Sequence, residues 1–186
     1  ITPPPGQTIA PIASEETTII LVGDIMLNRG IKDVIEKQGG GDFKFPFLKI
    51  ADYLNEADIV FGNLEGPISD KGTRVGSIYS FRADPKAIEG LKYAGFNVLS
   101  VANNHIFDYG RKAMEDTFFR LKEAKIDYVG GGLNEDEAYS PIIKEVNGLK
   151  IAFLAYTNLG AESWRAVGEN SGIAWIKFSD FEKIRK

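Results

Sequence analysis

The stretch Thr17-Thr-Ile-Ile-Leu-Val-Gly23, followed at once by Asp24, decides the fold class of this chain. Its β-branched and apolar residues predict a short buried strand that ends where the polar residues begin. Two more stretches, Ile59–Phe61 and Asn97–Val101, have the same character and also run directly into polar residues. Because these strands alternate with stretches of helical period, the sequence predicts an α/β domain with a largely parallel sheet.

Apolar residues at helical spacing occupy the intervals between and after these strands, and predict helices there. One helix is expected to open at an Asp-Pro pair and to stop at a glycine. The expected helices carry Phe47, Ile50, Ala51 and Leu54, run from Asp84-Pro85 to Gly95, and carry Met114, Thr117, Phe118 and Leu121.

Later strands are expected at Tyr128-Val129, Ile142–Val146 and Ile151–Ala155. The dipeptide Asn147-Gly148 joins the last two strands and predicts a hairpin with a two-residue turn.

Composition narrows the class of function. The chain has 186 residues, of which 44% are hydrophobic and 26% charged, as expected of a folded domain with a core. The net charge is -4 and no basic block is present, so nucleic-acid binding is not expected. Without cysteine, the chain forms no disulfide and no thiolate metal site. No apolar run reaches the roughly 20 residues that span a bilayer.

Residues 1–16 form a polar, proline-rich segment that includes Pro3-Pro4-Pro5-Gly6, a composition typical of a stiff linker. We interpret it as a tether that follows a signal peptide or membrane anchor outside this sequence. A cloning boundary explains the start at Ile1 equally well.

The other end of the chain predicts an interrupted element. Ser179 and Glu182 have the spacing of a capping box, which opens a helix shortly before the last residue, Lys186. Residues 17–186 are therefore expected to be the N-terminal part of a domain that is incomplete at its C-terminus.

Polar residues with ligand chemistry follow the three early strands. In an open α/β sheet, ligands bind beyond the carboxyl ends of the strands, so we expect these loops to form one site. Carboxylate, amide and imidazole groups are ligands of manganese, zinc and magnesium, so the site is expected to bind a divalent metal. The loops contain Asp24 and Arg29, then Asn63 and Glu65, then Asn104, His105 and Asp108.

Several of these residues also have a structural interpretation. Asp24 can cap backbone amides of its loop, and Glu65 can be a turn residue beside Gly66-Pro67. Asn104 can supply side-chain hydrogen bonds to a turn. For Asp108, which precedes a helix, an N-cap is the favoured interpretation.

His105 is the only histidine in the chain. A lone histidine is usually structural, but a position directly after a buried strand favours a functional role. Arg29 is the arginine of a strand-end loop and is a candidate for binding an anionic substrate.

Taken together, the motifs resemble those of the bacterial capsule synthesis proteins of the CapA family. This family is associated with poly-γ-glutamate and belongs to the metallophosphatase-like superfamily. The resemblance covers about residues 18–157. It rests on Val22–Leu27 with Arg29, Ala57–Pro67, Phe81-Arg82, Ala94–Phe96, Ala102–His105 with Asp108–Gly110, and Ala152–Thr157.

The resemblance implies a layered α/β/β/α sandwich, in which helices flank two stacked sheets, with the N-terminal half in this chain. It implies a location on the extracellular face of the bacterial cell membrane, behind an N-terminal anchor. It also implies later histidine-bearing loops that complete the metal site, so a chain without those loops is not expected to hold the metal fully.

The resemblance also implies roles for individual residues. Asn104 and His105 match a motif in which the asparagine binds metal and the histidine acts as general acid or stabilises developing charge. Met26 and Asn63, in contrast, stand where ordinary metallophosphoesterases have a histidine and an aspartate. Thioether and amide groups replace these poorly at a hard dication, which leaves Glu65 as the candidate carboxylate ligand.

Three functional hypotheses remain open, and the third is an ordinary cytosolic α/β enzyme. In the first, a metal-dependent hydrolase or transferase acts on a phosphate ester or a γ-glutamyl amide. In the second, a non-catalytic accessory subunit binds the capsule polymer or a membrane synthase complex. The first assigns Asp24, Glu65, Asn104 and His105 to the metal, His105 and Asp108 to catalysis, and Arg29 and Asn63 to a small anionic substrate or the polymer.

Overall fold

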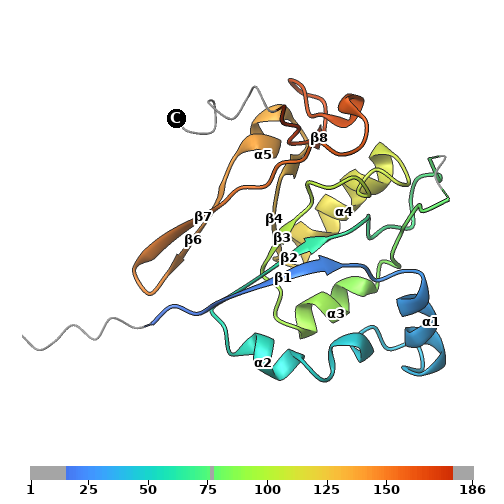
Figure 1. The fold of residues 1–186 in the computed structure, drawn as a ribbon, viewed down its shortest axis with the longest axis vertical. Helices are drawn as coiled ribbons and strands as arrows, with labels where there is room; N and C mark the ends of the chain where they lie inside the picture. The colour runs from blue at the N-terminus through green and yellow to red at the C-terminus, as the bar shows by residue number, and fades with distance from the viewer. Residues whose placement is uncertain (1–15, 76–77, 178–186) are drawn as a thin grey trace, which may run out of the picture.

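A four-stranded parallel sheet is the centre of the computed structural model, which describes residues 16–75 and 78–177. The strands lie in the order β1-β2-β3-β4, so neighbours in sequence are also neighbours in the sheet (Figure 1). They span Ile19–Ile25, Ile59–Leu64, Val98–Ser100 and Asp127–Val129. The α/β class is therefore confirmed, and the sheet is consistent with a metallophosphatase-like fold. The predicted linker up to Glu15 and the predicted helix at Ser179 lie outside the described residues.

Helices connect the parallel strands and supply one side of the core. Leu91 and Phe118 from two of these helices belong to the same buried cluster as Val60 and Leu99 from the sheet. The four residues that predicted the third helix, Met114 among them, are all buried. The connecting elements are α1 (Gly30–Lys37), the short 3-10 helix η1 (Phe45–Phe47), α2 (Ala51–Asn55), α3 (Ala87–Tyr93) and α4 (Arg111–Glu123).

The helix predicted around Phe47 to Leu54 is divided in two. Ile50 separates η1 from α2 because its φ of -124° is not helical. It is also 44% exposed, whereas Phe47 and Leu54 are buried in the core. The apolar spacing therefore predicted three of the four buried residues correctly, and it predicted the burial of Ile50 and the continuity of the helix wrongly.

The helix predicted to open at Asp84-Pro85 begins slightly later. Asp84 accepts hydrogen bonds from the N–H groups of Lys86 and Ala87, which form a turn ahead of α3. At the other end Gly95, with φ of 79°, adopts the left-handed conformation that ends the helix as predicted.

Strands β1 and β2 extend farther than the sequence predicted. Their pairing continues through Asp24 opposite Asn63, after a register shift between Leu21 and Asp24. Both polar side chains therefore belong to strand ends and do not lie in the loops where we expected them. A side chain on a paired strand is held more rigidly than one on a free loop.

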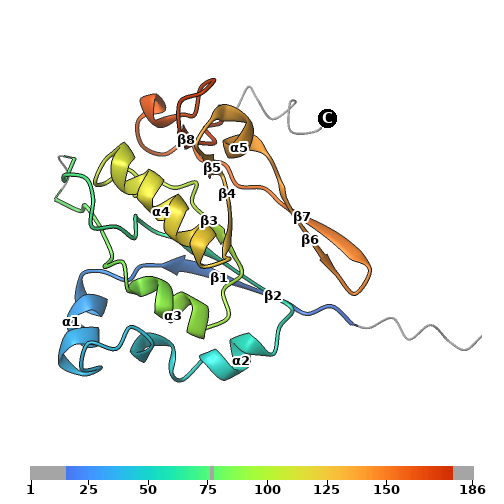
Figure 2. The ribbon, with the colours of Figure 1, turned by 180° about the vertical axis from the view of Figure 1, so that it is seen from behind.

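The predicted hairpin is present as β6 (Ile142–Val146) and β7 (Leu149–Phe153). Asn147 and Gly148 have φ of 49° and 78°, the positive values that a two-residue turn of this kind requires. The hairpin projects beyond the parallel sheet (Figure 2). It contacts the sheet through the stacked rings of Phe61 and Phe153, whose centroids are 5.5 Å apart.

The remaining elements gather beyond strand β4, at the end of the molecule that carries α5 and β8 (Figure 1). Two short strands pair there in antiparallel fashion. No helix in the two described ranges is long and apolar enough to span a membrane. These elements are β5 (Gly131–Gly132), α5 (Glu135–Tyr139), η2 (Glu162–Trp164) and β8 (Gly172–Ile173).

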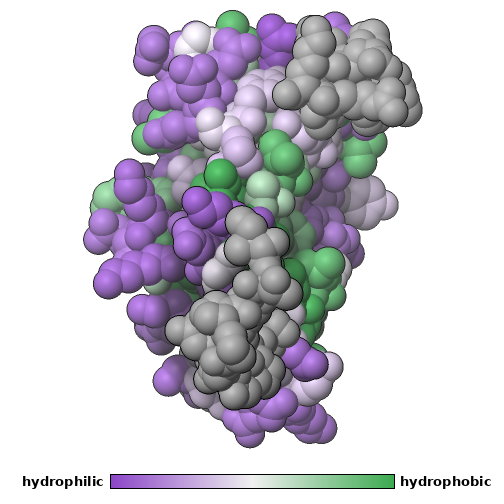
Figure 3. All heavy atoms as spheres, turned by 90° about the vertical axis from the view of Figure 1, so that its left-hand side faces the viewer, coloured by the Kyte–Doolittle hydropathy of each residue, from purple (hydrophilic) through white to green (hydrophobic). Residues whose placement is uncertain are grey.

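One face of β1 is open. Ile20 and Val22 pack against the core, whereas the alternate residues Ile19 and Leu21 are 38% and 67% exposed. The molecule also exposes apolar atoms between hydrophilic regions on the side from which the hairpin projects (Figure 3).

Candidate functional site

The carboxyl ends of β1, β2 and β3 meet at a cavity of about 680 Å³. Asp24, Asn63, Glu65 and Asn104 all line this cavity. Asp24 lies opposite Asn63 and Asn63 opposite Ser100, so the parallel pairing of the strands brings these residues together. The roles assigned to the four residues stay predictions.

Asn63 is bound on both sides by other side chains of the site. Its Nδ2 donates to Oδ1 of Asp24 at 2.7 Å, and its Oδ1 accepts from Nδ2 of Asn103 at 3.1 Å. Asn103 also donates to the backbone oxygen of Leu64 at 2.9 Å. This chain of amides orients Asp24, and it occupies polar atoms of Asn63 that a substrate was expected to contact.

Asn103 and Asn104 have different surroundings although they are adjacent. The Oδ1 atom of Asn103 accepts from the N–H groups of His105 and Ile106, both at 3.0 Å, which shapes the turn after β3. No hydrogen bond of the Asn104 side chain is present among the described residues, and this residue lines the cavity. The turn-forming role considered for Asn104 therefore belongs to Asn103, which the sequence analysis missed. An asparagine that bonds the backbone two and three residues on is a local turn signal.

His105 lies between two carboxylates. Its Nδ1 is 2.8 Å from Oδ2 of Asp108, and its Nε2 is 3.5 Å from Oε1 of Glu65. A carboxylate accepts and does not donate, so a proton on Nδ1 of the ring would be bonded to Asp108. The second nitrogen faces Glu65, which lines the cavity, whereas His105 itself is not among the residues that line it.

Asp108 is not an N-cap, and this interpretation of the sequence was wrong. The cap of α4 is Gly110, and no side chain bonds to it. Instead Oδ2 of Asp108 accepts from the backbone N–H of Phe81 at 2.7 Å, in addition to its contact with His105. The capping signal failed because the partner of Asp108 comes from a distant part of the chain.

Phe81 and Arg29 extend the site beyond the histidine. The Phe81 and His105 ring centroids are 4.2 Å apart. The guanidinium of Arg29 lies 5.4 Å from the centroid of the Phe81 ring, a cation-π distance. Arg29 is therefore attached to the site through an aromatic ring, and its assignment to substrate binding stays a prediction.

The opposite wall of the cavity comes from the segment after β7, to which the sequence analysis assigned no role. Tyr156, Thr157 and Asn158 line it. Thr157 is held in place because its N–H donates to the backbone oxygen of Ala174 at 3.1 Å. Burial raises the pKa of Tyr156. The sequence carried a usable signal, since these residues follow a predicted strand as the other site residues do.

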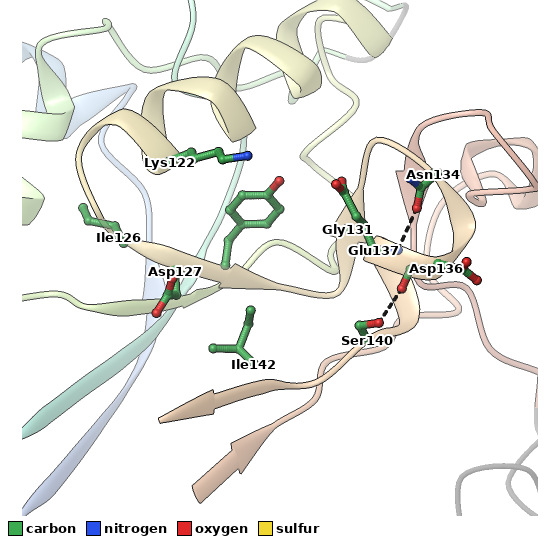
Figure 4. A pocket seen from close by; sticks show the side chains of 10 residues that line it. Lys122, Ile126, Asp127, Gly131, Asn134, Asp136, Glu137, Ser140 and Ile142 are labelled. Atoms are coloured by element: carbon green, nitrogen blue, oxygen red, sulfur yellow. Dashed lines mark hydrogen bonds between the residues drawn. The ribbon is translucent and has the colours of Figure 1, made fainter. Parts of the chain in front are cut away.

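A separate cavity of about 440 Å³ lies at the outer edge of β4 (Figure 4). Lys122, Tyr128 and Glu137 are among the residues that line it. Burial, followed by the charge of Glu137, raises the pKa of Tyr128 to about 12.

Comparison with known proteins agrees with the resemblance seen in the sequence. Residues 18–176 match the family described as bacterial capsule synthesis protein PGA_cap. The chain belongs to this family. The capsule biosynthesis protein CapA of Bacillus anthracis is 34% identical over 173 residues, which are 89% of this chain and 41% of that protein.

Other relatives are covered to a similar extent. The PGA biosynthesis protein CapA of Bacillus subtilis (strain 168) is 30% identical over 155 residues, 82% of this chain and 40% of that protein. A probable polyglutamine synthesis accessory protein of Mycobacterium tuberculosis is 24% identical over 194 residues, 86% of this chain and 51% of that protein. The chain thus spans 41% and 40% of the lengths of the two CapA relatives.

The donor chemistry of the site in this family member fits a hard divalent cation in part. Asp24 and Glu65 supply carboxylates and Asn104 supplies an amide oxygen, ligands that suit magnesium or manganese. In the part of the chain that the structure describes, no group of three or more His, Cys, Asp or Glu side chains can hold a metal ion. Metal binding at this site therefore stays a prediction.

Proposed function

We propose that this domain carries the reaction centre of a capsule-polymer biosynthesis protein, a metal-assisted hydrolase or transferase in which His105 transfers the proton. The arrangement of Glu65, His105 and Asp108 beside the cavity that Asp24 lines is the observation that carries the proposal. Asp108 contacts one ring nitrogen of His105, and the other nitrogen faces Glu65, which lines that cavity. A carboxylate that orients a histidine in this way is a recurring part of acid-base arrangements.

His105 is better placed for proton transfer than for metal binding. Both of its ring nitrogens face carboxylates, and its side chain is 16% exposed, so little of the ring is open to solvent. Asp108, with a side chain that is 7% exposed, keeps the ring in one orientation and stabilises it when it carries a second proton. Nε2 is then the atom that gives its proton to the leaving oxygen of a phosphate ester or to the leaving nitrogen of a γ-glutamyl amide.

Asp24, Glu65 and Asn104 are the residues of this chain that would hold a divalent cation, together with ligands from the part of the family proteins that this chain does not span. Such a cation would polarise the reacting group and lower the pKa of a bound water. Asn63 keeps the Asp24 carboxylate oriented toward this position through its 2.7 Å hydrogen bond. Arg29 supplies a positive charge for an anionic substrate near Phe81.

Calorimetric titration of the full-length protein with Mn²⁺ tests the proposal. We expect Asp24→Ala and Asn104→Ala to weaken Mn²⁺ binding at least about tenfold, and His105→Ala to abolish polymer production in cells. The matched control is Asp52→Ala, an exposed carboxylate on α2. Absence of Mn²⁺ binding by the wild type, with normal polymer production by His105→Ala, would rule the proposal out.

The setting of this reaction is part of the same proposal. We place the domain on the extracellular face of the bacterial membrane, anchored by a segment ahead of the proline-rich linker and working with a membrane synthase complex on the capsule polymer. The family description and the names of the CapA relatives refer to the synthesis of a capsule, which supports a place at the cell envelope. Protease digestion of intact cells tests it, because an extracellular domain is cleaved while cytoplasmic proteins stay intact.

A non-catalytic accessory subunit is the second candidate function. Asn63, in place of a carboxylate, favours it because this amide is bonded to Asp24 and Asn103 within the protein. Met26 favours it as well, since a thioether is a poor ligand for a hard cation. If Asp24→Ala and Glu65→Ala both leave polymer production in cells unchanged, the accessory function holds and the catalytic one does not.

A further inference from the structure

A cavity of about 370 Å³ adjoins the cavity of about 680 Å³ that Asp24 and Glu65 line, here called the polar centre. Asn104 and Leu159 line both cavities. We propose that this second cavity, the apolar pocket, binds an uncharged, carbon-rich segment of the substrate next to its reacting polar group. The inference rests on the proposed function, because His105 and Asp108 form the polar side of the pocket.

The aromatic wall of the apolar pocket is preformed. Phe107 is 4% exposed and stacks on Trp164 with ring centroids 5.1 Å apart and an angle of 5° between the planes. Gly160 has φ of 100°, and a Cβ at this position would collide with the Trp164 ring. Only glycine therefore lets the loop lie against the indole. The guanidinium of Arg111, 5.3 Å from the Phe107 ring, also contacts this stack.

Two exposed aliphatic side chains complete the walls. Val75 and Leu159 are 52% and 60% exposed, and both line the apolar pocket. A carbon-rich group seated between them and Trp164 would remove this apolar surface from water, which is favourable in proportion to the area covered.

The charges around the apolar pocket indicate which segment it accepts. The charged groups that line it within the described residues are His105 and Asp108, and these are already paired with each other. Arg111 contacts the Phe107 ring, but it donates to Ser171 and does not line the apolar pocket. A carboxylate or ammonium group placed against Val75 and Trp164 would therefore lose hydration without gaining a charged partner among the residues that line the pocket. The substrate is therefore an amphiphilic molecule with its polar group at the centre and an uncharged aliphatic or aromatic segment in the apolar pocket.

Binding of small probes to the full chain tests the inference without any need for turnover. Phenylphosphonate and methylphosphonate carry the same charged group and differ in the ring, whereas benzyl alcohol carries the ring without the charge. The readout is the indole N–H signal of Trp164 in an NMR titration, assigned by comparison with Trp175→Phe. We expect phenylphosphonate to shift this signal and to bind about tenfold tighter than methylphosphonate.

Variants locate the binding. Leu159→Asn is expected to remove the tenfold preference for phenylphosphonate over methylphosphonate, because it replaces the apolar side chain shared by the two cavities with a polar one. Leu133→Asn, at a leucine that is 49% exposed and lines neither cavity, is the matched control and is expected to keep it.

The outcomes separate the inference from the proposed function. If neither phenylphosphonate nor benzyl alcohol shifts the Trp164 signal, the apolar pocket does not bind uncharged, carbon-rich segments. The same conclusion follows if Leu159→Asn keeps the preference for phenylphosphonate. If benzyl alcohol shifts the signal and phenylphosphonate binds no tighter than benzyl alcohol, the apolar pocket stands and the polar centre fails as an anion-binding reaction site.

Discussion

Oδ2 of Asp108 lies 2.8 Å from Nδ1 of His105 and accepts the backbone N–H of Phe81 at 2.7 Å. One carboxylate oxygen therefore fixes both the imidazole and the backbone of the residue whose ring packs on that imidazole. The orientation of His105 depends on a contact between segments that are far apart in the sequence, which makes this contact a sensitive point of the site.

The first prediction concerns the proton on His105. Because His105 is the only histidine, long-range ¹H–¹⁵N spectra contain a single imidazole. We expect the wild type to carry the neutral-ring proton on Nδ1 and Asp108→Asn to shift it toward Nε2, since an amide can present a donor to Nδ1. We also expect Asp108→Asn to lower polymer production in cells by roughly 10²-fold or more.

The control for this prediction is Asp52→Asn, which exchanges the same groups at an exposed position on α2. An Asp108→Asn spectrum identical to that of the wild type would show that Asp108 does not set the protonation of the ring.

The second prediction separates the two adjacent asparagines. Asn103 makes hydrogen bonds to Asn63, Leu64, His105 and Ile106, and it is 7% exposed. Asn103→Ala leaves these buried groups without partners and is expected to lower the free energy of unfolding by about 2–4 kcal/mol. Asn104→Ala is expected to cost less than about 0.5 kcal/mol and to weaken Mn²⁺ binding.

Urea unfolding of both variants checks this difference. Equal stability losses for the two alanine variants would contradict the assignment of Asn103 as the residue that shapes the turn and Asn104 as the residue left for a ligand.

Much of the fold could be predicted because its signals are local. The runs of β-branched residues at Ile19 and Ile59 indicated strands, and Asn147-Gly148 indicated the hairpin from turn chemistry alone. Strand ends were harder to predict, since pairing between β1 and β2 carries both strands through polar residues such as Asp24 and Asn63. Backbone pairing with a neighbour outweighed the local preference of these residues.

The candidate site could be predicted only in part for the same physical reason. Strand-end position placed Asp24, Glu65 and Asn104 around one cavity. The partner of Asp108 could not be found, because Phe81 reaches it only in the folded chain. Tyr156 follows a predicted strand and could have been considered from the sequence, but its place in the wall of this cavity depends on tertiary structure, because its segment follows an antiparallel hairpin outside the parallel sheet.

The third prediction concerns Asp116, a buried carboxylate on α4. It lies 2.7 Å from Nζ of Lys71, 2.8 Å from Nε of Arg120 and 2.6 Å from Oγ of Ser69. Burial raises the pKa of Asp116, but the hydrogen bonds from Lys71, Ser69 and Arg120 and the charge of Arg120 outweigh it, so the pKa lies below its ordinary value of 3.8.

A lowered pKa means that the unfolded state binds the proton more readily than the folded state. The stabilisation by Asp116 is therefore complete above pH 3.8 and is lost as the pH falls through the lower pKa of the folded state. We expect Asp116→Asn to lower the free energy of unfolding by about 2 kcal/mol at neutral pH. The difference from wild type should narrow in acid, and Asp33→Asn, at an exposed i,i+4 pair, should show little effect at either pH. If the difference in free energy of unfolding between wild type and Asp116→Asn stays constant as the pH falls, the charge of Asp116 is not the source of the stabilisation.

The fourth prediction concerns the alkaline limit of stability. Burial and the charge of Glu137 raise the pKa of Tyr128 from 10.0 to about 12. Above pH 10.0 the unfolded state loses this proton while the folded state keeps it, so the free energy of unfolding declines between pH 10.0 and about 12. Tyr128→Phe cannot ionise and should remove this part of the decline, whereas Tyr53→Phe, at a side chain that is 63% exposed, should not.

Urea unfolding at about pH 9 and about pH 11 measures the decline, and ultraviolet titration of the folded protein measures the ionisation directly. A decline of the same size in wild type and Tyr128→Phe would mean that other groups set the alkaline limit.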